Sequence, residues 1–255
     1  SREPVHHLDA EGRERAAVVG FLCEQKDCYV DFDRIFAVSD ETAGVFAGVY
    51  PECQQKLSVF HNLIDTETIR QKALLPAEKA MHKGIRLLTV GRLTPQKGFD
   101  CAIYALKLLL EKQYPVYWYI IGEGPEYGRL TQLARSLHVE GHFIFLGMQT
   151  NPYPYFKMAD FYIHATRFEG KSIAIQEAQV LGCAIAASDC SGNREQIVSG
   201  VDGLLCPFSP EGIANAVEYL IEHPQTAESF GREAAQKACH FENDIHRIRD
   251  LLYSP

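Results

Sequence analysis

The chain of 255 residues lacks the long hydrophobic run that a membrane-spanning helix requires. Such a helix needs about 20 consecutive apolar residues, and the stretch 116–121 is among the longest apolar runs here. The opening residues SREPVHHLDAEGRER are too strongly charged to be a signal peptide. These residues also lack an initiator Met, so we expect them to be a boundary inside a longer protein.

Basic blocks, metal-ligand spacings, internal repeats and low-complexity segments are also missing. The chain carries 33 acidic and 25 basic side chains without a basic tail, which argues against a nucleic-acid partner. The eight cysteines have spacings such as Cys23-x4-Cys28 and Cys183-x6-Cys190, which match no zinc-ligand pair. We therefore expect buried, reduced thiols in a cytoplasmic protein, and a composition of 46% hydrophobic residues is ordinary for a globular fold.

From residue 85 onward, short apolar runs alternate with amphipathic stretches. The runs lie at 85–90, 116–121, 143–146, 160–165, 184–187 and 203–206, and the helix-like stretches lie at about 99–112, 126–138, 172–182, 192–199 and 210–222. This alternation predicts an α/β fold, a Rossmann-like parallel sheet with helices on both faces. Ligands of such sheets bind beyond the carboxyl ends of the strands, so the loops that follow the strands are the place to look for chemistry.

The first 83 residues have a different pattern, with helices at about 9–25 and 40–48 and strands at 34–38 and 57–61. Two strands cannot be covered on both faces, so this part belongs to another domain, with residues 72–83 as a linker. We therefore expect three parts, residues 1–83, 84–240 and 241–255. Helices at about 225–238 and 243–252 close the chain, and the second one packs on its own sheet, on residues 1–83 or on another copy.

A cationic loop follows the first strand of the main domain. It reads Gly91-Arg92-Leu93-Thr94-Pro95-Gln96-Lys97-Gly98. Two cations five residues apart, between a strand end and a helix, suit an anionic ligand such as a diphosphate. A solvated turn with two surface cations is the alternative.

A glycine-rich loop follows the second strand, with Gly122, Gly124 and Gly128. The third glycine is one place too far along for a dinucleotide fingerprint, and Gly147 stands where an acidic ribose ligand should end the next strand. Turn glycines, which let the backbone approach a ligand closely, are the better interpretation.

The loop after the fourth strand contains two acidic residues and a helix start. Glu169 lies in the loop, Ser172 can cap the following helix, and Glu177 lies more than a turn along it. A helix N-terminus attracts anions, and a carboxylate can accept hydrogen bonds from paired sugar hydroxyls. Two acids eight residues apart are weak evidence for a sugar-binding site by themselves. Their combination with the cationic loop strengthens this interpretation.

Several spaced motifs together resemble the retaining nucleotide-sugar glycosyltransferases of the large GT4-type family, glycosyl transferase group 1. They are Gly91-Arg92-x4-Lys97-Gly98, Phe145-Leu146-Gly147, Glu169-x7-Glu177, Ser191-Gly192-Asn193-Arg194-Glu195 and Asp202-Gly203-Leu204. The similarity runs from about residue 34 to 240 and covers mainly the C-terminal, donor-binding domain of the two-domain GT-B fold. Residues 34–39 and 56–65 resemble the end of the acceptor domain and its crossing to the donor domain.

The resemblance implies a role for each position of the diphosphate and sugar site. Gly91 begins the cationic loop, whose Arg92 and Lys97 would neutralise the donor diphosphate and stabilise it as a leaving group. Glu169 would contact hydroxyls of the transferred hexose near the reacting carbon. Backbone N–H groups of Gly170, Lys171 and Ser172 would assist it.

The nucleoside would be held by other positions. Glu177 would bind the ribose hydroxyls, and the backbone at Leu146, Gly147 and Met148 would face the base. Gly122 would allow close approach of the chain to the donor.

The resemblance further implies a retaining hexosyltransferase that needs no metal and uses a UDP-sugar in preference to a GDP-sugar. The acceptor would be a saccharide or lipid-linked saccharide of bacterial surface polysaccharide or glycolipid synthesis, at the cytoplasmic, inner face of the membrane. Most of the acceptor domain is missing, so we expect a truncated donor-binding part without transfer activity. His6, His7 and His61 match the family's histidine by type only and are expected to be solvent or packing residues.

Three alternatives remain open. A GT-B sugar-nucleotide epimerase would share the diphosphate site, and a non-catalytic nucleotide-binding module would share its ligand. The chain could also form a homo-oligomer.

Overall fold

A computed structural model of the protein describes residues 28–239. The chain divides into two compact units between His61 and Asn62. The helices expected at 9–25 and 243–252, together with His6 and His7, lie outside the described residues.

The described part of the first unit, residues 28–61, contains a two-stranded parallel sheet with helices. Its elements include β1 (Ile35–Ala37), α2 (Asp40–Val49), the 3₁₀ helix η1 (Pro51–Lys56) and β2 (Leu57–Val59). Ser39 caps α2 by accepting a hydrogen bond from the N–H of Thr42 at 3.1 Å. His61 Nδ1 lies 3.2 Å from the carbonyl oxygen of Val38. This histidine therefore has a structural contact within its own unit.

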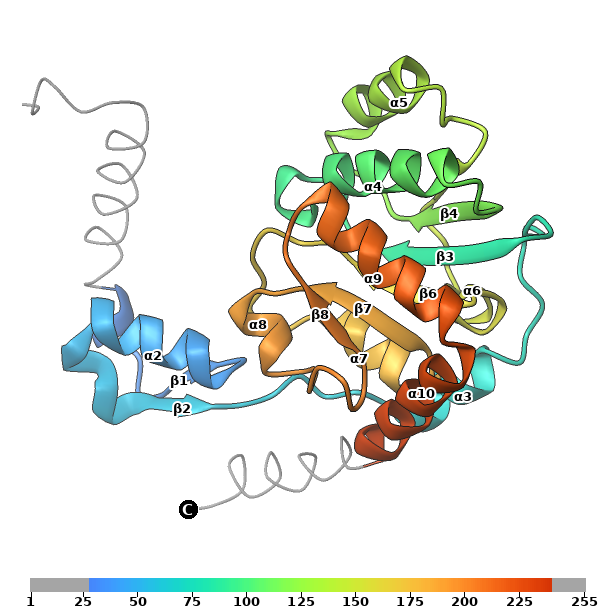
Figure 1. The fold of residues 1–255 in the computed structure, drawn as a ribbon. Coiled ribbons are helices and arrows are strands. Elements are labelled where there is room, and N and C mark those ends of the chain that lie inside the picture. Colours follow the sequence, from blue (N-terminus) through green and yellow to red (C-terminus); the bar gives the residue numbers. More distant parts are fainter. Residues whose placement is uncertain (1–27, 240–255) are drawn as a thin grey trace, which may run out of the picture. The chain divides into compact units, whose positions relative to one another are not determined.

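The second unit has the α/β fold expected from the sequence (Figure 1). Its elements are α3 (Thr66–Lys72), β3 (Ile85–Val90), η2 (Pro95–Lys97), α4 (Phe99–Glu111), β4 (Val116–Ile121), α5 (Tyr127–Ser136), β5 (Phe143–Gly147), α6 (Tyr153–Met158), β6 (Phe161–His164), α7 (Ile173–Val180), β7 (Ala184–Ser188), α8 (Ser191–Arg194), β8 (Leu204–Cys206), α9 (Pro210–Glu222) and α10 (Pro224–Ala238). The six strands β3 to β8 form one sheet in which all pairs are parallel.

The strand order β5-β4-β3-β6-β7-β8 places the first strand of the unit in the middle. The chain builds outward from β3 to β5 on one side, and from β6 to β8 on the other. The order therefore reverses between β3 and β6, where Leu87 pairs with Phe161. A crevice outside the carboxyl ends of the strands is expected at such a point.

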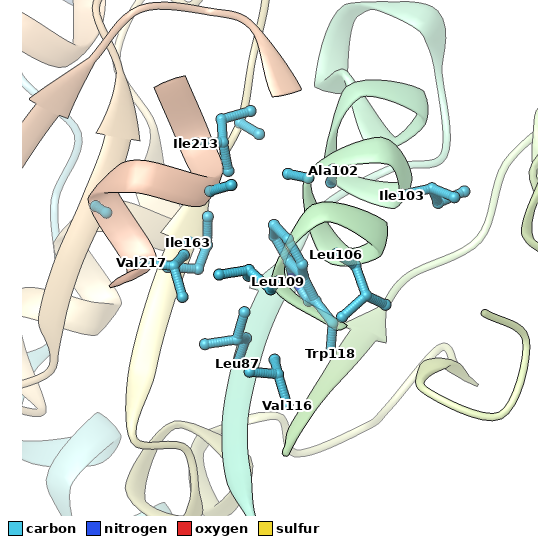
Figure 2. Close-up of a cluster of buried hydrophobic side chains, with 14 of the residues drawn as sticks. Leu87, Ala102, Ile103, Leu106, Leu109, Val116, Trp118, Ile163, Ile213 and Val217 are labelled. Atoms are coloured by element: carbon cyan, nitrogen blue, oxygen red, sulfur yellow. The ribbon is translucent and has the colours of Figure 1, made fainter. Parts of the chain in front are cut away.

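Side chains of the central strands alternate between the two faces of the sheet, as the pleat requires. Leu87 packs beneath α4 and α9, whereas Leu88 packs on the opposite face, with side chains of α6 and α7. Figure 2 shows the first of these clusters, in which Leu106 and Leu109 of α4 and Val217 of α9 meet the strands. Both faces of the sheet are thus covered, and this confirms the predicted fold class.

One buried polar chain crosses the cluster of Figure 2. Trp118, the single tryptophan of the sequence, donates its indole N–H to Thr89 Oγ1 at 2.9 Å. Thr89 in turn donates its hydroxyl to the carbonyl oxygen of Ile163 at 2.6 Å. These two hydrogen bonds tie β4, β3 and β6 together across the point where the strand order reverses.

The structure differs from the sequence-based expectations in the short elements. The strands at 85–90 and 116–121 and the helix at 210–222 have the predicted bounds. Helices α3 and α6 were not expected, and α8 covers only residues 191–194 of the predicted 192–199. All three are about one or two turns long, and such helices depend on packing more than on their own propensity.

The boundary between the units also differs from the expected one at residues 83 and 84. Ile64 and Ile69 are buried against Val180 and Ala238 of the second unit. The segment 62–83 therefore belongs to the second unit. Within the predicted linker, residues 72–83, the N–H groups of Lys79 and His82 donate to the hydroxyls of Tyr155 and Tyr119. That residues 1–83 derive from an acceptor domain stays a prediction.

No helix within residues 28–239 is long and apolar enough to cross a membrane.

Replacement of Thr89 by valine tests the buried polar chain. Thr89→Val keeps the shape of the side chain but leaves the Trp118 indole N–H and the Ile163 carbonyl buried without this partner. A buried group that loses its partner costs about 1–3 kcal/mol, and we expect that loss in the free energy of unfolding. Urea denaturation followed by the fluorescence of Trp118 measures it.

Thr89→Ser is the matched control, because it retains the hydroxyl and removes only a methyl group. It should recover most of the stability lost in Thr89→Val. A Thr89→Val chain as stable as the wild type would show that the hydroxyl bridge adds nothing to the sheet.

Candidate functional site

The loops after β3 and β6 form one hydrogen-bonded unit at the reversal of strand order. The carbonyl oxygen of Gln96 accepts hydrogen bonds from Thr166 Oγ1 at 3.0 Å and from the N–H of Arg167 at 2.8 Å. The Gln96 side chain donates to the carbonyl of Phe168 at 3.0 Å. These bonds fix the cationic loop beside the loop that carries Glu169.

Lys97 and Glu169, which the sequence separates by 72 positions, meet at this point. The Lys97 ammonium forms an ion pair with Glu169 Oε2, and their side chains are only 19% and 12% exposed. The buried ring of His164 contributes a third group, since its Nε2 lies 3.2 Å from the same Glu169 oxygen. The sequence analysis predicted the first two residues and missed His164, which is hidden inside an apolar strand and is distinguished only by its place at the strand's carboxyl end.

Burial and charge act against each other in this cluster. Burial by itself would raise the pKa of Glu169, but hydrogen bonds from His164 and Lys97 and the Lys97 charge lower that pKa to about 2. Burial lowers the pKa of His164, with the Lys97 charge acting in the same direction and the bond to Glu169 opposing it. Glu169 is therefore a carboxylate at neutral pH, and His164 is a neutral imidazole.

These protonation states fix the tautomer of His164. An ionised carboxylate can only accept hydrogen bonds. The Nε2 nitrogen of His164 therefore carries the ring proton, and this N–H donates a hydrogen bond to Glu169. The Nδ1 nitrogen is then an acceptor, and the Tyr162 hydroxyl lies 3.2 Å from it. Tyr162 and His164, both on β6, therefore orient the carboxylate of Glu169.

Arg92 occupies a different position from Lys97. Its side chain is exposed and lines a cavity of about 310 Å³, together with Gly91, Gly122, Met148 and other residues. The two predicted cations thus belong to one loop but face different surroundings, one at a cavity wall and one in a half-buried ion pair. Joint binding of a diphosphate by both stays a prediction.

The fold itself requires a glycine at position 122. Its φ is +144°, and a Cβ atom there would lie 2.0 Å from the carbonyl oxygen of Gly91. The close approach that this glycine permits in the structure is to the neighbouring loop, and an approach to a donor stays a prediction.

The backbone at the end of β5 and just beyond it is largely occupied by internal hydrogen bonds. The carbonyl of Leu146 accepts from Gln149 Nε2 at 2.9 Å, and that of Gly147 accepts from the N–H of Gly122 at 3.0 Å. The N–H of Met148 donates to Glu123 Oε1 over 3.4 Å, a long bond, and the Met148 side chain is 71% exposed. Of these groups, the Met148 main chain is held most weakly, so it is the one most easily offered to a base.

Ser172 caps α7 as expected, by accepting a hydrogen bond from the N–H of Ile175 at 3.4 Å. Its own N–H donates to Gln196 Oε1 at 2.6 Å. The N–H of Ser172, which the resemblance assigned to ligand contact, therefore already has a partner. Contact of a ligand with Gly170 and Lys171 stays a prediction.

Glu177 lies on the second turn of α7 and is half-buried. Its Oε1 accepts the hydroxyl of Tyr153 at 3.0 Å. Burial raises the pKa of Glu177, and the bond from Tyr153 partly offsets that rise. Tyr153, which the sequence analysis missed because α6 was not expected, holds one oxygen and leaves the other to accept a hydroxyl.

Within residues 28–239, no group of three or more His, Cys, Asp and Glu side chains is arranged to hold a metal ion. The expectation that no metal is required stays a prediction.

The ion pair predicts a pH-dependent stability. The folded pKa of Glu169 is about 2 and its ordinary value is 4.5, so the pair stabilises the fold above pH 4.5 and loses that effect as pH falls toward 2. We expect Glu169→Gln to be less stable than the wild type at pH 5, and the gap to narrow by about 2 kcal/mol at pH 3. Urea denaturation at both pH values measures the gap.

Glu228→Gln serves as the control, because Glu228 is an exposed acid on α10 whose surface ion pair with Arg232 contributes little. A Glu169→Gln gap that is the same at pH 5 and pH 3 would contradict the lowered pKa.

Comparisons with known proteins point to one family. The sequence family described as "Glycosyl transferases group 1" matches residues 68–237. The N-acetylgalactosamine-N,N'-diacetylbacillosaminyl-diphospho-undecaprenol 4-alpha-N-acetylgalactosaminyltransferase of Campylobacter jejuni is 30% identical over 200 residues, which are 78% of this chain and 53% of that protein. An uncharacterised glycosyltransferase of Haemophilus influenzae is 32% identical over 158 residues, 60% of this chain and 44% of that protein. The chain thus spans about half the length of these curated relatives.

Solved structures show the same fold. The crystal structure of Anabaena HepE in complex with UDP-glucose has a TM-score of 0.82 at 20% identity and covers 95% of this chain and 70% of that one. The Rossmann-like sheet unit thus corresponds to one half of a GT-B fold. Together with the match over residues 68–237, this shows that the chain belongs to the glycosyl transferases group 1 family.

Proposed function

We propose that the chain binds a nucleoside diphosphate sugar, preferably a UDP-hexose, across the reversal point between β3 and β6. The observation that carries the proposal is the Lys97–Glu169 ion pair, set against buried His164 at the reversal of strand order, where α/β sheets bind ligands. Glu177 lies on the helix that begins a few residues further along. The whole protein would be a retaining hexosyltransferase of bacterial surface polysaccharide or glycolipid synthesis.

The cations act on the diphosphate in this proposal. The Lys97 ammonium has three donors, so it can bridge Glu169 and a phosphate oxygen. The guanidinium of Arg92 reaches further phosphate oxygens as a fork. Both charges stabilise the diphosphate as it leaves.

Glu169 acts on the hexose as a permanent anion. With a pKa of about 2 it cannot serve as a general acid. It can accept hydrogen bonds from sugar hydroxyls and stabilise the positive charge that develops at the anomeric carbon. The bond from that carbon to the phosphate oxygen breaks, the bond to the acceptor oxygen forms on the same face, and the acceptor proton passes to the leaving phosphate.

The relatives support the choice of donor and acceptor. The Campylobacter jejuni protein is named as a transferase of N-acetylgalactosamine to a diphospho-undecaprenol-linked saccharide, and the Anabaena structure is a complex with UDP-glucose. A lipid-linked saccharide acceptor is therefore part of the proposal, which also includes metal-independent transfer at the cytoplasmic face of the membrane.

The cationic loop is tested by removing both charges. We expect the double variant Arg92→Ala/Lys97→Ala to lose measurable UDP binding, because each charge-assisted bond contributes about 1.5–3 kcal/mol. Isothermal titration calorimetry with UDP measures the affinity. Lys107→Ala/Arg232→Ala removes the same charge from the outer surface of α4 and α10 and should bind UDP normally. Equal affinity in the two double variants would contradict the diphosphate site.

The role of Glu177 is tested with the ribose itself. The wild type should bind UDP about tenfold more tightly than 2′-deoxy-UDP, because the 2′-hydroxyl donates to the carboxylate. Glu177→Ala should bind both nucleotides with equal, weakened affinity in the same calorimetric assay. Tyr153→Phe frees one Glu177 oxygen and should keep the preference. A Glu177→Ala chain that still discriminates would place the ribose elsewhere.

A further inference from the structure

The main chain of Ser172 is paired with the side-chain amide of Gln196. The Ser172 N–H donates to Gln196 Oε1 at 2.6 Å, and Gln196 Nε2 donates to the Ser172 carbonyl at 2.9 Å. This is the two-bond pattern that a neighbouring strand would supply, here made by one side chain. Gln196 is 3% exposed, so water does not compete for either bond.

Gln196 is itself held from the opposite side. Its main-chain carbonyl oxygen accepts hydrogen bonds from Gln179 Nε2 at 2.8 Å and from Lys237 Nζ at 2.6 Å. Lys237 also pairs with Asp202 Oδ2 at 2.7 Å. The residue that holds Ser172 is thus anchored to the C-terminal ends of α7 and α10, and it has little freedom to follow a moving loop.

The other end of the same loop rests on α8. A Cβ atom on Gly192 would lie 2.1 Å from the carbonyl oxygen of Glu169 and 2.4 Å from that of Gly170. The loop from Glu169 to Ser172 is therefore pressed on α8 at its start and hydrogen-bonded beyond α8 at its end. The backbone path of this loop is therefore fixed by its contacts with α8 and Gln196.

We propose that Gln196 is a positioning residue for the sugar part of the donor, acting through Ser172 and the loop that carries Glu169. This inference rests on the proposed function, because it assigns the loop to the hexose. The groups proposed for the diphosphate and base lie on the loop after β3 and at the end of β5, and none of the hydrogen bonds that Gln196 makes within residues 28–239 reaches either segment. Loss of its two bonds should therefore weaken the contribution of the sugar and spare that of the nucleotide.

The ratio of UDP-hexose affinity to UDP affinity isolates this contribution. Calorimetry would compare UDP with UDP-glucose, UDP-galactose and their N-acetylated counterparts, and the conjugate that gains most over UDP serves as the probe. Gln196→Met keeps the volume of the side chain and removes both bonds. We expect its UDP affinity to stay within about twofold of the wild type and the ratio to fall about tenfold.

Gln179→Met is the matched control. It removes a buried glutamine that contacts the same segment after α8, at a comparable cost in stability. Both bonds between Gln196 and Ser172 stay in place, and Lys237 still holds the Gln196 carbonyl. Thermal denaturation establishes that both variants are folded. The ratio should remain that of the wild type in Gln179→Met.

Gln196→Glu adds a readout that a merely structural role would not move. A protonated carboxyl again offers one acceptor and one donor, whereas the ionised form opposes the Ser172 carbonyl. Burial beside that carbonyl favours the protonated form. The ratio should therefore recover at pH 5.5 and be lost at pH 8 in this variant, while the wild type, measured in parallel, corrects for all other titrations.

The outcomes separate the two proposals. A wild type that binds neither UDP nor any of the conjugates contradicts the proposed function, and this inference with it. A wild type that binds them, with an unchanged ratio in Gln196→Met, overturns the role of Gln196 alone. The same holds if the ratio in Gln196→Glu is equal at pH 5.5 and pH 8.

Discussion

The parallel pairing of β3 with β6 is the constraint on which the candidate site depends. Parallel neighbours end at the same edge of a sheet, so the loops that follow them must share that edge. The pairing brings Lys97 and Glu169 into contact across 72 positions of sequence. Gln96 then holds the two loops together, since its side chain donates to Phe168 and its carbonyl accepts from Thr166. The sheet supplies a rigid support that neither loop could supply alone.

Placing Glu169 there has an electrostatic cost that its neighbours offset. A carboxylate that is 12% exposed loses most of its hydration, and this loss alone would favour the protonated acid. The Lys97 charge and the His164 N–H reverse that preference. Neutral His164 matters for a second reason, since a second cation would bind Glu169 so strongly that the carboxylate would have less capacity left for a sugar hydroxyl.

The sequence allowed prediction of the fold and of those residues whose signal is local. The apolar strands at 85–90 and 116–121 are recognised without any partner, so their bounds were predicted correctly. His164 and Gln196 carry no such local signal. Their contacts with Glu169 and Ser172 are recognised only once the fold has brought these residues together. Helix α6 escaped prediction for a related reason. Its six residues are too few to form a helix without tertiary contacts, and with α6 the sequence analysis also missed Tyr153, the partner of Glu177.

The charges of the cluster also mean that Lys97 alone would not suffice for the proposed diphosphate. The ionised Glu169 and the Lys97 ammonium cancel, and His164 is neutral, so the cluster as a whole offers an anion no net attraction. The chain adds a formal net charge of −8, which opposes an anion at long range. In the proposed complex, attraction must therefore come from outside the ion pair, and the exposed guanidinium of Arg92 is the group placed to supply it. Because Arg92 is exposed, its attraction for an anion weakens as salt is added. The Lys97–Glu169 ion pair is less exposed and is screened much less.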